Sequence, residues 1–477
     1  FTNTKSPITN LAYHSCGNRQ TGEDRVRGYF ATNINKRAGL GFKIDYSYGI
    51  GYYYAQPNSM FGSTFYGYYR GDRYNLHAYI GINHMKMGEN GGIEDDRYIE
   101  DPLAFGQEYT SGNIPTMLSQ TWNRNHEQHA YLTHRYNVGF SRTIEVPDSL
   151  KPTPPSASAL ISNLPDSIQT ILRQDSVMRK LTVDSLLQVW NDTLTVPSEF
   201  VPVTSFIHTF EMSNLKHEYL SHNTTQNYYT HNYYGDTNEM SDLTRALSVR
   251  NTFGVALREG FNKWAKAGLT AFVTHEYRDF TLPDSTDIPG QRIIKHYKEN
   301  VVYAGGELIK EQGKLLHYKV LGEVAVAGED AGQFRFEGNG DLNLRLFGDS
   351  IRLDVQAYIK NLNPIFYYRH FHSKHYWWDN NDLSKIMRTR VEGKISSQRL
   401  GTTLRVGVEN IKNYTYLANT SIPVTNAAGE ITSFKNNASV MQESGNIQVF
   451  SAILQQKLKW GILHFDSEIA YQKSSNQ

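Results

Sequence analysis

The stretch DLNLRLFGDSIRLDVQAYIK, from Asp341 to Lys360, alternates apolar and polar residues on either side of its central FGDS. Successive residues of a β-strand point to opposite sides of a sheet, so the alternation predicts a hairpin with one apolar and one charged face. A soluble sandwich would bury the apolar face, whereas a membrane barrel would turn it to lipid and keep the charges inside, around water. The rest of the sequence has to decide between these arrangements.

The composition excludes several classes of protein. The 477 residues include 48 basic and 47 acidic ones, and this balance predicts no field strong enough to hold nucleic acid. The mean hydropathy is -0.54, and no apolar run approaches the ~20 residues of a membrane-spanning helix. A membrane barrel stays open, because its strands are only half apolar and hardly register in hydropathy.

Alternating segments recur along the whole chain. We count about 16 strands, with Pro7 to Ser15 as a candidate for one more, and many reach about 12 residues, a length typical of tilted membrane strands. Short turns such as FGDS alternate with long irregular loops such as Lys86 to His126, and aromatic residues gather near strand ends. These features predict an all-β fold, a transmembrane antiparallel up-and-down β-barrel of about 16 or more strands, with short periplasmic turns and long extracellular loops.

One connection interrupts this alternation. Residues 147–202 hold a Pro/Ser-rich segment and, from Asp166 to Trp190, apolar residues at helical spacing. This partly helical insert is predicted on the periplasmic side, between a first part of the barrel, residues 1–146, and the remainder, residues 203–477. It is either a plain difference in length or a docking element for a periplasmic partner. The chain opens in mid-pattern and ends in SSNQ, so we expect further sequence at both ends.

The alternation also assigns residues to the two faces of the barrel wall. About 16 strands would enclose a lumen too wide for side chains to fill, so the inner face must be polar and wet. The charged residues predicted to line the lumen are Arg135, Arg250, Arg258, Lys319, Glu323, Arg335, Glu337, Asp341, Arg345, Arg352, Asp354, Lys360, Arg405, Glu409, Asp466 and Glu468. The apolar residues predicted to face lipid are Leu342, Leu344, Leu346, Leu353, Val355, Ile359, Val406 and Phe465. Both signs of charge alternate on the inner face, which predicts weak ion selectivity.

Two motifs hold weak candidates for metal ligands. ENGGIEDD groups oxygen donors, among them Asp95 and Asp96, but it lacks the spacing of a calcium loop. In RHFHSKH only His370 and His372 share a face of an extended segment, and packing is favoured over metal binding. We therefore expect no metal and no cofactor. The chain has no GxSxG, HExxH or phosphate-binding loop, and we expect no enzyme activity.

Four segments of the chain carry a family resemblance: SPITNLAYHSCG (Ser6 to Gly17), ENGGIEDD (Glu89 to Asp96), PVTSFIHTF (Pro202 to Phe210) and NPIFYYRHFHSKHYWWDN (Asn363 to Asn380). Together they resemble a known family, the "putative porins" of Bacteroidota outer membranes. The resemblance implies a β-barrel in the outer membrane of a diderm bacterium, surrounded by outer-membrane lipid and lipopolysaccharide. It implies no particular substrate.

Two functions remain open. The first is a porin-like channel, in which small solutes diffuse through a polar lumen of mixed charge. The second is a non-conducting barrel that serves as a subunit or scaffold of an outer-membrane complex. Its partners would be other outer-membrane or periplasmic proteins, bound by the insert or by tyrosine-rich outer loops such as NYYTHNYYG. The wet lumen favours the first function, and the insert favours the second.

Overall fold

The computed structural model describes residues 5–17, 22–143, 155–193, 198–224, 228–235, 240–261, 266–284, 293–346 and 348–475. The chain divides into two compact units. One comprises Phe1–Asn137 with Thr204–Gln477, and the other comprises Val138–Val203.

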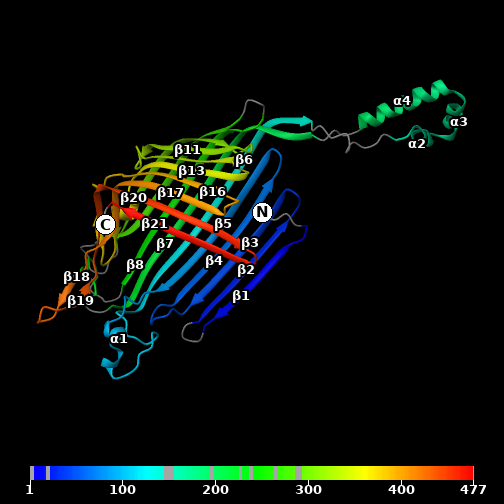
Figure 1. The fold of residues 1–477 in the computed structure, drawn as a ribbon. Helices are drawn as coiled ribbons and strands as arrows, with labels where there is room; N and C mark the ends of the chain where they lie inside the picture. Colours follow the sequence, from blue (N-terminus) through cyan, green and yellow to red (C-terminus); the bar gives the residue numbers. More distant parts are fainter. Residues whose placement is uncertain are drawn as a thin grey trace. The chain divides into compact units, whose positions relative to one another are not determined.

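The larger unit is built on a 17-stranded sheet, in which each strand pairs with the next main strand along the chain and neighbours are antiparallel (Figure 1). This confirms the predicted antiparallel meander of about 16 or more strands. The candidate strand from Pro7 to Ser15 corresponds to β1. The strands are β1 (Ile8–Cys16), β2 (Glu23–Asn33), β3 (Ala38–Gly49), β4 (Asn58–Arg70), β5 (Tyr74–Gly88), β6 (Leu118–Thr143), β7 (Ser198–Thr224), β8 (Met240–Leu257), β9 (Gly268–Asp284), β10 (Ile293–Lys310), β11 (Leu316–Gly328), β12 (Phe334–Leu346), β13 (Asp349–Leu362), β16 (Ile386–Ser397), β17 (Thr402–Asn419), β20 (Ala438–Trp460) and β21 (Leu463–Ser474).

Short and long connections alternate along this meander. Only two residues separate β12 from β13 and β20 from β21, and each of these turns holds a glycine with positive φ, Gly348 at 75° and Gly461 at 62°. Glycine adopts this conformation without a steric cost, which suits so tight a reversal. Because antiparallel neighbours reverse direction, the short turns of the unit share one end of the sheet, the short-turn rim, and the long connections share the other, the long-loop rim.

The long connections hold small elements of their own, where the sequence predicts irregular loops. Figure 1 shows α1 and the β18–β19 hairpin at the same end of the sheet. The elements are α1 (Arg97–Glu100) and the 3-10 helix η1 (Pro102–Phe105) before β6, α5 (Phe366–Arg369), β14 (His370–His372) and β15 (Trp377–Asp379) before β16, and β18 (Ile422–Thr425) and β19 (Ile431–Lys435) before β20.

The insert forms three helices, α2 (Ala157–Ser162), α3 (Asp166–Gln174) and α4 (Ser176–Thr193). The predicted helical segment, Asp166 to Trp190, corresponds to α3 and α4. Residues 147–154 and 194–197 of the predicted insert lie outside the described residues, and its periplasmic location stays a prediction. In the part of the chain that the structure describes, no helix is both long and apolar enough to cross a membrane.

The sheet leaves many apolar side chains uncovered. Phe253 on β8, Val355 on β13 and Phe465 on β21 are 61%, 44% and 61% exposed. Within the described ranges, β1 pairs only with β2 and β21 only with β20, so the described sheet has two edges. The expectation of further strands stays a prediction.

Candidate functional site

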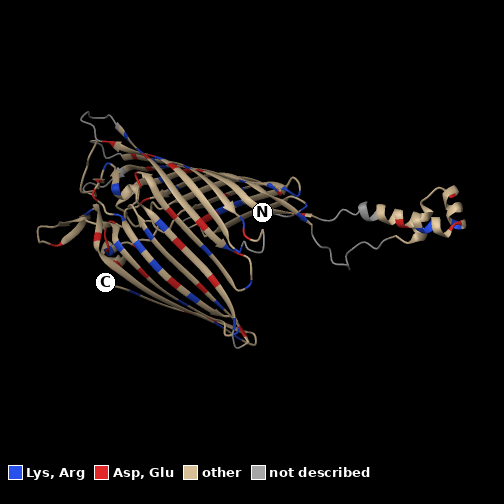
Figure 2. Cartoon of the chain, turned by 90° about the horizontal axis from the view of Figure 1, so that it is seen from above, with Lys and Arg blue, Asp and Glu red and all other residues tan. Residues whose placement is uncertain are grey.

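One face of the sheet is polar from strand to strand. Asp341 lies opposite Asp354, and Leu342 lies opposite Leu353, so the two carboxylates share one face of the β12–β13 hairpin and the two leucines share the other. Residues directly opposite each other in antiparallel strands point the same way, and the registers of the other pairs extend this polar face across the sheet. Figure 2 shows basic and acidic residues as bands along the strands.

The registers bring the predicted lumen residues to this polar face. They are Arg135, Arg250, Lys319, Glu323, Arg335, Glu337, Asp341, Arg345, Arg352, Asp354, Lys360, Arg405, Glu409, Asp466 and Glu468, together with Arg258, which follows the last residue of β8. The opposite face holds the backbone positions of Leu342, Leu344, Leu346, Leu353, Val355, Ile359, Val406 and Phe465. The side chain of Leu346 lies outside the described residues.

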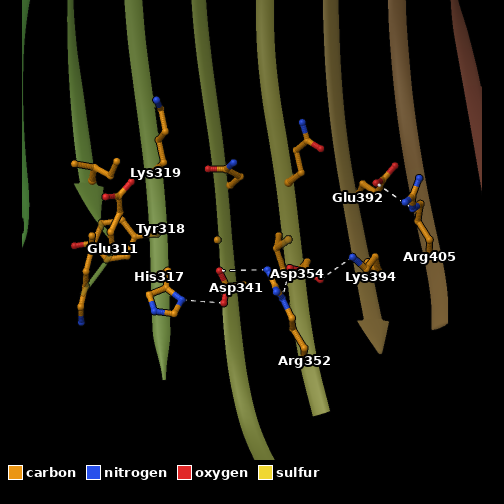
Figure 3. Close-up of a pocket in the computed structure, with 16 residues that line it drawn as sticks. Glu311, His317, Tyr318, Lys319, Asp341, Arg352, Asp354, Glu392, Lys394 and Arg405 are labelled. Atoms are coloured by element: carbon orange, nitrogen blue, oxygen red, sulfur yellow. Dashed lines mark hydrogen bonds and ion pairs between the residues drawn. The ribbon is translucent and has the colours of Figure 1, made fainter. Parts of the chain in front are cut away.

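A hollow of about 440 Å³ opens in the polar face near the short-turn rim (Figure 3). His317 Nδ1 lies 3.0 Å from an oxygen of Asp341. Asp354 lies between Arg352, whose Nε is 2.8 Å from Oδ1, and Lys394, whose Nζ is 3.0 Å from Oδ2. Charged side chains therefore line a space that suits water and polar solutes, and not an apolar ligand.

Further ion pairs continue the charged surface toward the long-loop rim. Glu409 accepts hydrogen bonds of 2.8 Å from Arg388 Nε and from the Tyr358 hydroxyl. Arg390 reaches both Glu409, at 3.3 Å, and Glu392, at 2.5 Å. Arg388 and Arg390 were not among the predicted lumen residues, although they share the alternation of Glu392 and Lys394 in IMRTRVEGKISS.

The loop of residues 363–385 packs against the polar face near the long-loop rim. Phe366 stacks on Phe280 of β9, with ring centroids 3.8 Å apart. Arg369 Nη2 donates to Glu299 of β10 at 2.8 Å, and the Lys374 amide donates to Asp242 of β8 at 2.9 Å. The loop therefore covers part of the surface that alternation alone assigns to an open lumen.

A buried cluster of charges lies where this loop meets the wall. Arg278 of β9 donates to Glu276 at 2.9 Å, to Glu299 at 3.2 Å and to Asp330 at 2.8 Å. Burial alone would raise the pKa of the Asp330 carboxyl, but hydrogen bonds from Tyr303 and Arg278 hold it below its usual value. Three carboxylates thus share the Arg278 guanidinium, and only Glu299 has a second one, from Arg369. The sequence prediction missed this cluster because Asp330 comes from a separate turn.

Three long connections contact one another at the same rim. The ring of Tyr229 stacks on His375 with centroids 3.9 Å apart, and the Tyr233 amide donates to the Lys374 carbonyl at 2.9 Å. The Thr230 amide donates to the carbonyl of Asn436, which follows β19, at 3.1 Å. Burial raises the pKa of the Tyr228 hydroxyl to about 12 and lowers the pKa of the His375 imidazole. These groups stay uncharged near neutral pH, and the loops are held by stacking and neutral hydrogen bonds.

The weak metal candidates have other partners. His370 Nδ1 and His372 Nε2 lie 2.7 and 3.0 Å from the two carboxylate oxygens of Asp379. This pairing tightens the β14–β15 hairpin. Asp95 accepts from the amide and the Nε of Arg97 at 2.9 and 3.0 Å, and Asp96 is the N-cap residue that precedes α1. Among the described residues, no group of three or more His, Cys, Asp or Glu side chains is arranged to hold a metal ion.

A family model matches this chain, and several solved structures share its fold. The model of a family described as "Putative porin" matches residues 1–477. Among curated proteins, none matches the chain. The siderophore receptor PirA from Acinetobacter baumannii has a TM-score of 0.55 at 9% identity, and the match covers 98% of this chain and 62% of the receptor. PirA from Pseudomonas aeruginosa has a TM-score of 0.56 at 8% identity, with coverage of 98% and 66%.

The RagAB peptide importer shares the fold as well, with a TM-score of 0.51, 8% identity and coverage of 95% of this chain and 50% of that one. At identities this low, the structural similarity shows the fold alone, and the ligands of those proteins are not carried over to this chain. The chain spans less than two thirds of the length of the Acinetobacter baumannii receptor. Together with the family match, these neighbours confirm the predicted outer-membrane β-barrel class and the bacterial outer membrane as its location.

Proposed function

The chain belongs to the putative porin family, and from this premise we propose that its polar face lines a wet lumen through which small polar solutes diffuse passively. The charged face carries the proposal. Ion pairs and the charged lining of the hollow of about 440 Å³ make this face hydrophilic, and many apolar side chains of the other face stay uncovered. Charged groups are stable beside water, and apolar groups are stable beside lipid.

Conductance in a planar lipid bilayer tests this proposal. Purified chain is expected to insert and to produce discrete conductance steps in potassium chloride. Protein denatured by boiling in detergent is the matched control and should produce none. A folded preparation that inserts into the bilayer without any steps would contradict the passive channel.

A second candidate function is a non-conducting subunit or scaffold. The insert favours it, because α3 and α4 leave Ile171, Val177 and Leu181 55%, 68% and 63% exposed. Exposed apolar side chains on a helix are a common means of docking a partner. Recovery of a stoichiometric outer-membrane or periplasmic partner in mild detergent, lost in a chain without residues 157–193, would support this function. A chain always recovered alone would count against it.

Placing one arginine on each face tests the assignment of lipid and lumen. Val355 and Gln356 are neighbours on β13 that point to opposite faces. Val355→Arg is expected to lower the free energy of unfolding by roughly 2 to 4 kcal/mol, because its charge would enter the hydrocarbon. Gln356→Arg, the matched control, should change it by less than about 1 kcal/mol, because its position faces Glu392 on the polar face. Urea unfolding in lipid vesicles measures both, and equal losses would contradict the assignment.

A further inference from the structure

The polar face of three neighbouring strands carries more cations than carboxylates. On β13, β16 and β17 this face holds three carboxylates, Asp354, Glu392 and Glu409. The cations of the same three strands, which we call the basic strip, are Arg352, Lys360, Arg388, Arg390, Lys394 and Arg405. Cations therefore outnumber carboxylates by six to three on this part of the wall.

The charges of the basic strip also differ in depth. The side chains of Arg352, Arg388 and Arg405 are 54%, 47% and 48% exposed. The carboxylates that they contact are less exposed: Glu409 is 10%, Glu392 14%, Asp341 19% and Asp354 23% exposed. A solute in front of this wall meets guanidinium groups first. The acidic pair on the same face nearest to the C-terminus, Asp466 and Glu468 of β21, is separated from β17 by β20.

Each of the three carboxylates already has two cationic partners, which for Glu392 are Arg390 and Arg405. Asp354 lies between Arg352 and Lys394, and Glu409 lies between Arg388 and Arg390. The carboxylates are thus occupied within the wall, and they offer little to a passing cation. The exposed N–H groups of the arginines can still donate to an anion, for which the planar guanidinium is well suited.

We propose that the basic strip is a binding path for small anions, such as inorganic phosphate and carboxylates, and that it makes the channel anion-selective. This inference rests on the proposed channel function and replaces the weak selectivity that charge alternation predicts. Alternation counts the two signs equally, whereas on β13, β16 and β17 the arginines are more exposed than the carboxylates that they contact. A wall potential of about one kT raises the local ratio of monovalent anions to cations about sevenfold, and the effect weakens with salt.

The reversal potential across a bilayer with a tenfold potassium chloride gradient measures this selectivity. The wild-type channel is expected to prefer chloride over potassium several-fold at low salt. The triple variant Arg352→Gln, Arg388→Gln, Arg405→Gln should bring the ratio close to one. It is expected to fold, because Lys394 still contacts Asp354 and Arg390 still contacts Glu392 and Glu409.

Arg37→Gln is the matched control, because Arg37 is 56% exposed, pairs with Asp72 and lies in the turn between β2 and β3, away from the strip. It should leave the ratio unchanged. Conductance steps without chloride preference in the wild type, or a triple variant as selective as the wild type, would overturn the inference and leave the channel function intact.

Phosphate binding separates this inference from the channel function. Equilibrium dialysis of inorganic phosphate against the detergent-solubilised chain at low salt needs no conductance. We expect binding by the wild type and by Arg37→Gln, with a loss of at least several-fold in the triple variant. If no conductance steps are seen, the channel function is wrong, and dialysis alone tests whether the basic strip binds anions. Phosphate binding that is equal in wild type and triple variant, or absent from both, would overturn the inference.

Discussion

Replacing Arg278 with glutamine is expected to lower the free energy of unfolding by about 3 to 5 kcal/mol, because it leaves buried carboxylates without their cation. Arg278 contacts Glu276, Glu299 and Asp330, whose side chains are only 14%, 6% and 5% exposed. Arg369 still reaches Glu299, but neither Glu276 nor Asp330 has a second guanidinium partner among the ion pairs of the described residues. Urea unfolding in detergent, followed by tryptophan fluorescence, measures the loss.

The loss should depend on pH. Arg278 helps to hold the pKa of Asp330 below its usual value, so the stability contributed by this carboxylate is present above its unfolded pKa, near 4, and is lost as the pH falls through its lower folded value. Below that range Asp330 is protonated with or without Arg278. The difference between variant and wild type is therefore expected to shrink in acid.

Arg25→Gln is the matched control for Arg278→Gln. Arg25 also donates to a carboxylate, Asp45, at 2.7 Å on the polar face, but the two side chains are 49% and 24% exposed. Water screens such a pair, so its loss should lower the free energy of unfolding far less than the loss of Arg278 does. If both variants lost similarly little free energy of unfolding, the Arg278 cluster would not be an important source of stability.

The strands were predictable because their signal is local. In DLNLRLFGDSIRLDVQAYIK every second residue faces the same way, and a polar and an apolar face can be read without knowing the neighbouring strands. The register of β12 and β13 pairs Asp341 with Asp354 as this alternation requires. The full length of β6, which begins at Leu118, was not predictable. Its first residues pack beside β7 and come before the part of the strand in which apolar and polar residues alternate regularly.

The segments that pack on the polar face were not predictable in the same way. The stacking of Phe366 on Phe280 joins residues far apart in the chain, and aromatic residues in a loop carry no mark of the wall that they contact. The pairing of His370 with Asp379 depends on a hairpin whose strands have only three residues each. Exposure of Arg352 above Asp354 is likewise a matter of depth, and alternation gives the face of a residue without its depth.

Shortening the loop of residues 363–385 is expected to enlarge the pore. We would replace residues 366–379, which comprise α5 and the β14–β15 hairpin, with a short Gly/Ser linker. Single-channel conductance should rise roughly two- to fivefold, because this segment packs on the polar faces of β8, β9 and β10 and would narrow the proposed lumen in front of them. Glu299 loses Arg369 but keeps Arg278, so the wall cluster remains paired.

The β18–β19 hairpin provides a matched control at the same rim. Its two strands pair only with each other among the described strands, and Figure 1 shows the hairpin projecting from the end of the sheet. Replacing residues 422–435 with the same linker removes as many residues and should leave the conductance unchanged. If both variants fold and insert but conduct like the wild type, the loop of residues 363–385 does not obstruct the path of ions. If only the loop variant conducts more, the constriction is this loop, because the wall strands are identical in the two proteins.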